Sequence, residues 1–389
     1  MKYFALSATA LCLGGLSLFA CQQTPLAPVN AQQNARLEQF QANYQASATQ
    51  IAQNLGETLA PNEAAATREI EQHILATLKK NFSAPPMKRD VHAKHHGCVK
   101  AQFQVQNQAL PPALRVGVFA QNQSFPAWLR FSNGGSDPNV PDTKGDIRGL
   151  AIKLMGVPGK KLLPTQADAR TQDFVMMNNR EFFIEELKDY VAFSSAVAHG
   201  GLSLAGFAIT HPRVSYRLYK IFGKQTINPL ESEFFSATAY QLGNRPIKFK
   251  VRPCQAPRST MPAKPGPNYL REAMVNTLKQ QSACMELMVQ PHSGNFEQMP
   301  VENATVEWPE QASAYVPVAR ITMAPQSFDS PAQMQFCENL SFTPWHSLPE
   351  HRPLGVTNRV RKSVYELISE FRHSFNQVPR QEPEGFAPF

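Results

Sequence analysis

The sequence predicts an α+β protein with an antiparallel β-barrel core and helices packed outside it. Short β-rich runs separated by Pro, Gly and Asn occupy residues 85–180, a pattern typical of antiparallel strands. The 32 prolines are spread along the chain, which favours many short elements over a helical bundle, because proline interrupts helix interiors. Amphipathic segments before and after the β-rich region predict the helices. A hydrophobic content of 42% with 25 phenylalanines can supply a large core.

The N-terminal segment is predicted to be a secretory signal. "MKYFALSATALCLGGLSLFAC" has a lysine near its start, a mostly apolar stretch and a small residue before Cys21. Its end, "LFAC", resembles the lipobox of bacterial lipoproteins, which implies a signal peptide at 1–20 and a lipid on Cys21. An ordinary cleaved signal followed by an incidental cysteine is the alternative. Because Gln22 follows instead of an aspartate, the resemblance implies an anchor at the periplasmic face of the outer membrane.

Beyond the signal, residues 21–60 are rich in Gln, Ala and Asn and show no clear core face. We expect them to be a tether between the lipid and a folded domain at 61–389. The first element of that domain is an amphipathic helix in "NEAAATREIEQHILATLKKNF", with Asn62 as its N-cap.

The remaining elements follow in order. Strands are predicted in "VKAQFQV", "AWLRFSN", "GLAIKLM", "DFVMM", "RPIKFKVRP", "CMELMVQP" and "YVPVARITM". Residues 181–230 have a helical or irregular pattern, and "NYLREAMVNTLKQQ" predicts a helix. A last helix contains "RVRKSVYELISEFRH".

Composition and motifs argue against several classes of function. The net charge of +8 is diffuse, without a basic run, so we expect no nucleic-acid partner. The chain has no GxGxxG after a strand, no P-loop, no GxSxG and no HExxH.

Four cysteines remain beyond the lipid site, namely Cys98, Cys254, Cys284 and Cys337. Their spacing does not fit zinc, and disulfides are possible in an oxidising compartment, with the pairing left open.

Two segments carry candidate chemistry. "RDVHAKHHG" brings together three histidines, which could bind a metal, lie exposed in a loop, or include one reactive histidine beside a flat ligand. In the last helix, Arg361, Tyr365 and Arg372 stand at i, i+4 and i+11 and therefore share one face. A basic, solvated face with Tyr365 on the core is the simplest interpretation of that second pattern.

Several segments resemble the heme catalases, in the same order along the chain. "RDVHAKHHG" resembles their distal-histidine segment, "LRFSNGG" their V-R-F-S strand, and "DIRGLAIKLM" their D-P-R-G-F-A-V-K-F strand. "DFVMMNNREFFI", "NYLREAMVNTL" and "VEWP" are similar to later segments, and "RKSVY" matches the R-x-x-x-Y motif of the iron-binding tyrosine. The resemblance covers roughly residues 85–375 and implies a minimal catalase-like domain with heme b between the barrel and the C-terminal helix.

The resemblance assigns roles around that heme. Tyr365 would bind the iron as a phenolate, and Arg361 one turn earlier would stabilise the negative charge. Three arginines match the contacts of the heme propionates, whose carboxylates suit the guanidinium fork. These arginines are Arg89, Arg130 and Arg372.

On the other side of the heme, the resemblance makes His92 the acid–base residue, oriented by Ser132. An asparagine should hold the peroxide. Because "VMMNNREFF" differs by one residue in spacing from the large catalases, Asn178 is the first choice and Asn179 the alternative. Val91 is the residue found before the histidine in catalases, whereas the related coral allene oxide synthases carry threonine there.

The implied function is heme-dependent decomposition of hydrogen peroxide to water and oxygen. Because the arm, wrapping loop and C-terminal domain of large catalases have no counterpart in the sequence, a wider entrance could admit organic hydroperoxides. A heme peroxidase or a fatty-acid hydroperoxide-rearranging enzyme is therefore the alternative, followed by a heme-binding lipoprotein without fast turnover. We expect a monomer or homodimer.

Overall fold

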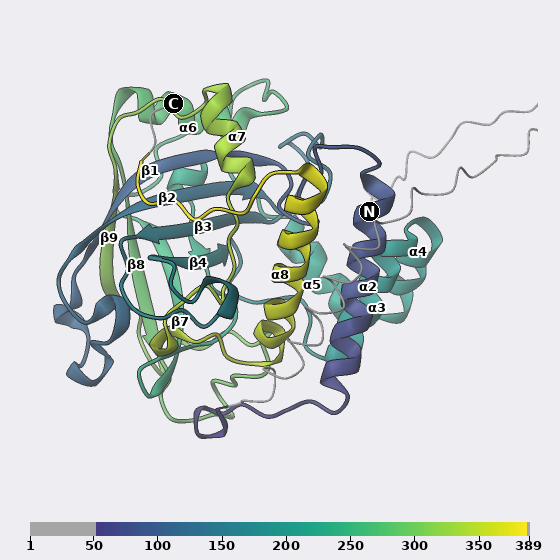
Figure 1. Cartoon of the computed structure of the whole chain (residues 1–389), viewed down its shortest axis with the longest axis horizontal. Helices are drawn as coiled ribbons and strands as arrows, with labels where there is room; N and C mark the ends of the chain where they lie inside the picture. Colours follow the sequence, from purple (N-terminus) through teal and green to yellow (C-terminus); the bar gives the residue numbers. More distant parts are fainter. Residues whose placement is uncertain (1–51, 387–389) are drawn as a thin grey trace, which may run out of the picture.

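The computed structural model describes residues 52–386, in which one antiparallel sheet closes on itself and helices pack outside it (Figure 1). The strand order is β5-β4-β3-β2-β1-β9-β8-β7-β6, and β5 also pairs with β7. This second pairing closes an eight-stranded barrel and leaves β6 as an additional strand beside β7. The predicted α+β class with a β-barrel core is confirmed.

The strands are β1 (His95–Val105), β2 (Ser124–Asn133), β3 (Arg148–Met155), β4 (Thr171–Met177), β5 (Phe234–Phe235), β6 (Tyr240–Leu242), β7 (Arg245–Pro253), β8 (Ala283–Pro291) and β9 (Val316–Met323). The helices are α2 (Glu63–Asn81), α3 (Leu187–His199), α4 (Gly201–Thr210), α5 (Pro212–Phe222), α6 (Tyr269–Gln280), α7 (Pro331–Asn339) and α8 (Val356–Asn376). Each strand predicted from the sequence lies within one of these strands, except that "YVPVARITM" begins one residue before β9, and the predicted helices correspond to α2, α6 and α8.

The barrel interior is built by side chains that alternate along each strand, because successive residues of a strand point to opposite faces. In β2, Leu129 and Phe131 lie in the main hydrophobic core, as do Leu150 and Ile152 of β3. The residues between them point outward, toward the helices.

The same alternation places another row of residues side by side on the outer face of the barrel. Ser132 pairs with Gly149, and Gly149 pairs with Met177, so these positions lie side by side across β2, β3 and β4. Arg130 pairs with Ala151 one step along the same face. This outer face is the floor of the candidate site described below.

The helices form layers on that side of the barrel (Figure 1). α8 lies against the barrel, α2 packs on α8, α3 packs on α2, α4 packs on α3, and α5 follows α4 and ends beside Gly145. In the part of the chain that the structure describes, no helix combines the length and the apolar composition needed to cross a membrane.

Contacts with the domain already begin in the segment expected to be a tether. Leu55 and Glu57 are buried, and Glu57 makes ion pairs with Arg352 and Arg359. Asn62 precedes α2, but its side chain makes no capping hydrogen bond. The signal peptide, Cys21 and most of the predicted tether lie outside the described residues.

Two disulfides use the four cysteines whose pairing the sequence left open. Cys98 of β1 bonds Cys337 of α7, and Cys254 bonds Cys284 at the start of β8. Such bonds are typical of proteins from oxidising compartments.

Candidate functional site

A cavity of about 700 Å³, counting its open mouth, lies between the outer face of the barrel and α8. The chain before β1 supplies one part of the wall, strands β2–β4 the floor, and α8 with the segment that follows α7 the opposite wall. The lining residues that bear on its chemistry are Arg89, Asp90, Val91, His92, Arg130, Ser132, Ser341, Phe342, Tyr365, Ile368, Ser369 and Arg372.

His92 is held by its backbone and its ring together. Its φ of 58° lies in the left-handed region, which is uncommon for a residue other than glycine and is found at functional sites. The backbone N–H donates to the Gly134 carbonyl at 3.0 Å, and Nδ1 lies 3.0 Å from Ser132 Oγ. A Cβ at Gly149 would come within 2.6 Å of the imidazole, so only glycine leaves room for the ring there.

The electrostatic surroundings keep this histidine uncharged. Burial, followed by repulsion from Arg130, lowers the pKa of His92 to about 3. The imidazole is therefore neutral at neutral pH and can accept a proton, as an acid–base residue must.

Tyr365 and Arg361 form a pair on α8. Arg361 donates a hydrogen bond to the Tyr365 hydroxyl at 3.0 Å and a second to Asn358 Oδ1 at 3.1 Å. Although burial alone would lower the pKa of Arg361, attraction to Tyr365 raises it, so the guanidinium stays charged. The helix thus presents to the cavity a phenol oxygen that already receives a charge-assisted hydrogen bond.

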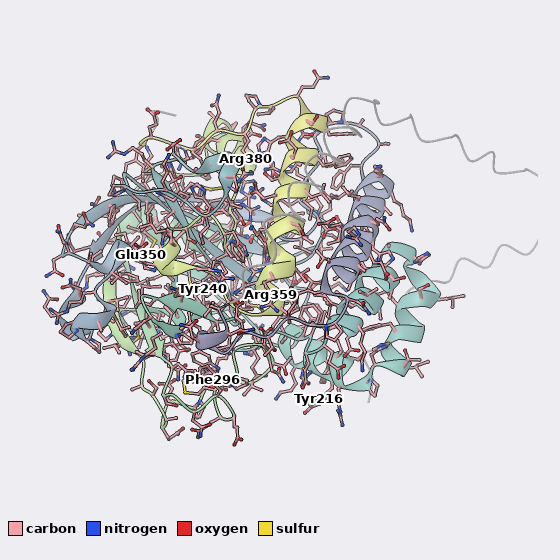
Figure 2. All side chains as sticks on the ribbon, turned by 60° about the horizontal axis from the view of Figure 1, so that its bottom comes forward. Tyr216, Tyr240, Phe296, Glu350, Arg359 and Arg380 are labelled. Carbon is pink, nitrogen blue, oxygen red and sulfur yellow. A yellow bond between two sulfur atoms is a disulfide. The ribbon has the colours of Figure 1, made fainter. Side chains whose placement is uncertain are left out.

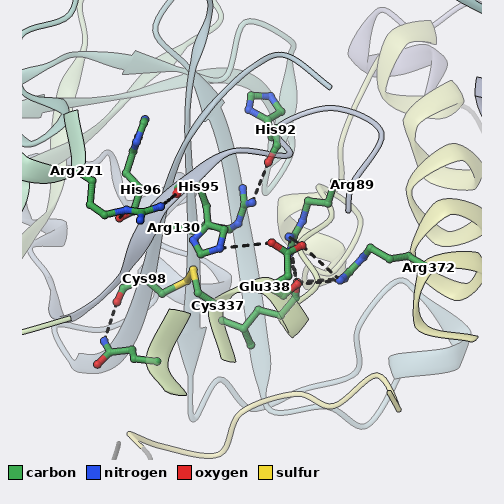
Figure 3. The surroundings of a disulfide bond; sticks show 12 residues. Arg89, His92, His95, His96, Cys98, Arg130, Arg271, Cys337, Glu338 and Arg372 are labelled. Carbon is green, nitrogen blue, oxygen red and sulfur yellow. Dashed lines mark hydrogen bonds and ion pairs between the residues drawn. A yellow bond between two sulfur atoms is a disulfide. The ribbon is translucent and has the colours of Figure 1, made fainter. Parts of the chain in front are cut away.

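A cluster of buried charges lies at one side of the cavity (Figure 3). We call Arg89, Arg130, Arg372 and Glu338 the arginine cluster. Arg89 contacts the Glu338 carboxylate at 3.1 Å, and Arg372 donates to the Glu338 carbonyl at 2.8 Å. Arg130 donates to the His92 carbonyl at 2.8 Å, whereas its buried Nε has no hydrogen-bond partner among the described residues.

The cluster carries an excess of positive charge. Burial, followed by repulsion from Arg89, lowers the pKa of Arg130 well below its usual range and that of Arg372 to about 9. Burial opposes ionisation of Glu338, but the hydrogen bond from His95 and the charge of Arg89 hold the pKa of this carboxyl well below its usual range. Three guanidinium groups and one carboxylate leave two positive charges. Buried positive charge of this kind is stabilised by an anion.

Most of the site residues predicted from the sequence meet at this cavity. His92, Ser132, Arg89, Arg130, Val91, Tyr365 and Arg372 line it, and Arg361 contacts Tyr365. They come from segments far apart in the sequence, which the closed barrel and α8 bring together.

The predicted distal asparagine is not among the lining residues. Asn178 Oδ1 accepts a hydrogen bond from the Arg148 backbone at 2.7 Å, and Asn179 donates to the Glu181 carbonyl at 2.7 Å. The physical reason is that β4 ends at Met177, so the Asn178 side chain bonds the start of β3 and the Asn179 side chain bonds the turn that follows β4. Met177, not an asparagine, lies beside Gly149 on the outer face.

The other two histidines of "RDVHAKHHG" are buried, so the interpretation as exposed loop residues is wrong. His95 Nε2 lies 3.4 Å from Glu338, and His96 Nε2 lies 3.0 Å from Asn133 Oδ1. Among residues 52–386, no three His, Cys, Asp or Glu side chains are grouped in a way that could hold a metal ion.

Sequence reasoning missed two acidic residues of the site. Asp90 lines the cavity, and burial raises the pKa of its carboxyl to about 7. It stands at the variable position of the histidine motif, so no pattern marks it. Glu338 lies next to Cys337 in α7, a helix that the disulfide to β1 holds beside the site, and no sequence motif marks it.

Comparison with known proteins agrees with this geometry at the level of the fold. Solved structures similar to this one include a fungal catalase (TM-score 0.61, 16% identity), catalase A from Saccharomyces cerevisiae (0.59, 17%) and a bacterial catalase (0.55, 16%). The fold is that of the catalases. The alignments cover 75%, 75% and 77% of this chain, but only 61%, 63% and 59% of those catalases, so the chain spans about three fifths of their length. No protein-family profile matches the sequence, and no curated protein is similar to it in sequence.

Proposed function

We propose that this protein binds heme b in the cavity and decomposes hydrogen peroxide to water and oxygen. The observation that carries the proposal is a single cavity lined by the Tyr365 phenol, by the uncharged His92 and by the arginine cluster. The catalase fold supports it, because catalases bind heme through a tyrosine.

The residues present fit that group. Tyr365 would hold the iron through its oxygen, with Arg361 stabilising the anionic form. Arg89, Arg130 and Arg372 would bind the carboxylates of the heme, and the unpartnered Arg130 Nε is one donor available for them. The two excess positive charges of the arginine cluster match the two propionates of heme b.

When bound, the heme supplies the redox chemistry of peroxide decomposition. The chain supplies the proton transfer. With Nδ1 of His92 occupied by Ser132, Nε2 is the atom that takes a proton from one peroxide oxygen and returns it to the other. The Gly134 carbonyl holds the His92 backbone, Ser132 holds the ring, and Gly149 leaves room for it, so the imidazole is already oriented for this transfer.

A second candidate is turnover of organic hydroperoxides, and two observations favour it. No asparagine lines the cavity, so the second hydrogen bond to a small peroxide has no evident donor. Val91 lines the cavity and is 48% exposed, so an apolar side chain stands where substrate could pass. A wall of this kind suits an alkyl group better than water or hydrogen peroxide.

The test begins with the absorption spectrum of the purified protein mixed with hemin. We expect a sharp Soret band with the high-spin ferric pattern of tyrosinate ligation, which Tyr365→Phe should abolish. Tyr315→Phe, which removes a hydroxyl that does not line the cavity, is the matched control. A spectrum equal to that of free hemin would overturn the proposal.

Activity is then measured in the loaded protein. We expect oxygen release from hydrogen peroxide to fall by about two to four orders of magnitude in His92→Ala, the usual size of a general acid–base contribution, with heme still bound. Faster consumption of a fatty-acid hydroperoxide, without oxygen release, would favour the second candidate. Equal activity of wild type and His92→Ala would leave a heme-binding protein without this chemistry.

A further inference from the structure

Helices α4 and α5 present large apolar side chains to solvent, and α4 lies at the edge of the molecule (Figure 1). In α4 every residue except Phe207 is exposed, and Leu202 and Ile209 are 92% and 80% exposed. On α5, Tyr216 and Tyr219 are 63% and 67% exposed, and Tyr216 stands at the periphery in Figure 2. We call Leu202, Ile209, Tyr216, Tyr219 and Phe222 the α4–α5 surface.

Helical geometry groups these side chains on defined faces. Leu202 and Ile209 are separated by two turns and lie on one face of α4. Tyr216 and Tyr219 share a face of α5, while Val214 and Ile221 point the other way into a hydrophobic cluster with α3. The exposed residues therefore form a second apolar face, opposite the one that the fold has buried.

Charge gives this surface its chemical character. Residues 199–230 contain no aspartate or glutamate, and they contain Arg213, Arg217, Lys220 and Lys224. Arg217 pairs with Glu185 at 3.2 Å, and the Lys220 ammonium lies 5.8 Å from the Tyr216 ring centre. Basic groups beside exposed aromatic and aliphatic side chains are the combination found in helices that lie in the interface of an anionic bilayer.

We propose that the α4–α5 surface docks on an anionic phospholipid bilayer. Helices of this length cannot span the hydrocarbon core, but they can lie in its interface with the apolar side chains inserted. The tyrosines suit the boundary between acyl chains and headgroups, because each has an apolar ring and a polar tip. Arg213 and Lys220 then meet the lipid phosphates.

The same charges disfavour a second copy of the chain as occupant. A symmetric contact through the α4–α5 surface would bring the basic residues of two copies together, without a carboxylate from residues 199–230 to neutralise them. A bilayer with anionic headgroups supplies the missing opposite charge. The proposal does not depend on heme or on peroxide chemistry.

The test uses the chain beginning at Gln22. This chain retains every described residue and lacks Cys21, the residue expected to carry the lipid. Binding is measured by cosedimentation with vesicles of phosphatidylcholine, with or without phosphatidylglycerol. Leu202→Ser/Ile209→Ser removes apolar contacts, and Arg213→Gln/Lys220→Gln removes charge. Leu59→Ser, an exposed leucine elsewhere, and Lys144→Gln/Lys279→Gln, two exposed lysines elsewhere, are the matched controls.

We expect binding to the anionic vesicles, weakened by salt, and about a tenfold or greater loss of partitioning in each α4–α5 pair but not in the controls. Circular dichroism should show that these surface changes leave the fold intact. The proposal would be overturned if the parent chain did not bind the vesicles. It would also be overturned if both double variants bound them as strongly as the parent chain does. A concentration-dependent dimer that Leu202→Ser/Ile209→Ser dissociates would overturn it too, because the surface would then belong to a second copy.

Discussion

At the scale of single residues, the site is defined by charges that burial makes costly. Asp90 is one of them, since its carboxyl lines the cavity with a pKa raised to about 7 by burial. The folded state then binds more protons than the unfolded state between about pH 4 and 7, so this residue lowers stability as the pH rises through that window.

Asp90→Asn should therefore increase the free energy of unfolding by about 1–2 kcal/mol at pH 8, and by much less at pH 4. Urea denaturation at the two pH values, without hemin, measures the difference. Asp137→Asn, a change in an exposed turn, is the control. A gain that does not depend on pH would contradict the assigned titration.

Replacing Glu338 should have the opposite effect on stability from replacing Asp90. Glu338 is the one carboxylate of the arginine cluster, so Glu338→Gln leaves three buried guanidinium groups without compensation. We expect a loss of about 3–5 kcal/mol, the cost typical of breaking a buried ion pair. Thermal unfolding measures it, with Glu310→Gln on the surface as control.

Hemin should restore part of that loss if the arginine cluster receives its carboxylates. A variant as stable as the parent would show that Glu338 does not neutralise the cluster. A destabilised variant that hemin leaves unchanged would separate Glu338 from the proposed cofactor site.

At the scale of elements, α8 is fixed by a buried arginine at its first turn (Figure 2). Arg359 contacts Glu57 at 2.7 Å, Glu63 at 2.7 Å and Glu302 at 3.0 Å. One guanidinium thereby joins the C-terminal helix to the chain before α2, to α2 itself and to the loop that carries Glu302.

Arg359→Ala should destabilise the protein by about 3–5 kcal/mol, because it removes the ion pair of Glu63 and leaves the buried Glu57 with Arg352 alone. Chemical denaturation measures the effect, and Arg320→Ala, whose side chain is half exposed, is the control. Adding Glu57→Gln and Glu63→Gln should recover stability, since the repulsion is then removed. No recovery would mean that packing, not charge, explains the loss.

Elements with strong periodicity could be predicted from the sequence. β2 and β3 alternate clearly, and α8 has a distinct face, which is why Arg361, Tyr365 and Arg372 could be placed together. α4 could not be recognised in the same way, because apolar residues occur on its exposed side as well as at the buried Phe207, so no contrast marks a buried face. β5 has two residues, too few for any periodicity.

The site was predictable where a side chain stands at a fixed spacing within one element, as with Tyr365 and Arg361. It was not predictable where tertiary contacts decide. Glu338 meets the arginine cluster through contacts with residues far away in the sequence, and Asn178 turns away because β4 ends one residue earlier. Neither contact can be recognised from the residues next to Glu338 or Asn178 in the sequence.

At the scale of the whole molecule, buried neutral histidines make stability depend on pH. Burial lowers the pKa of His92, His96 and His351 to about 3 each. The unfolded state binds more protons between about pH 3 and 6.5, so stability falls as the pH drops through that window, by up to about 1.4 kcal/mol per pH unit for each histidine.

His351→Gln should flatten this dependence while keeping an acceptor for the Val118 backbone N–H, which His351 Nε2 binds at 2.9 Å. Unfolding free energies measured from pH 7 down to pH 4 give the slope. His199→Gln, at an exposed helix end, should leave the slope as it is. An unchanged slope in His351→Gln would show that this histidine is not kept neutral by the fold.

The cavity joins segments from nearly opposite ends of the described chain, and this has a consequence for biosynthesis. Arg89 and His92 leave the ribosome more than 250 residues before Tyr365 and Arg372. A growing chain can fold strands and close hairpins, but it has only one wall of the pocket until α8 is complete. Any molecule that needs both walls can thus be captured only after α8 has joined the barrel, so chains interrupted before α8 cannot hold it.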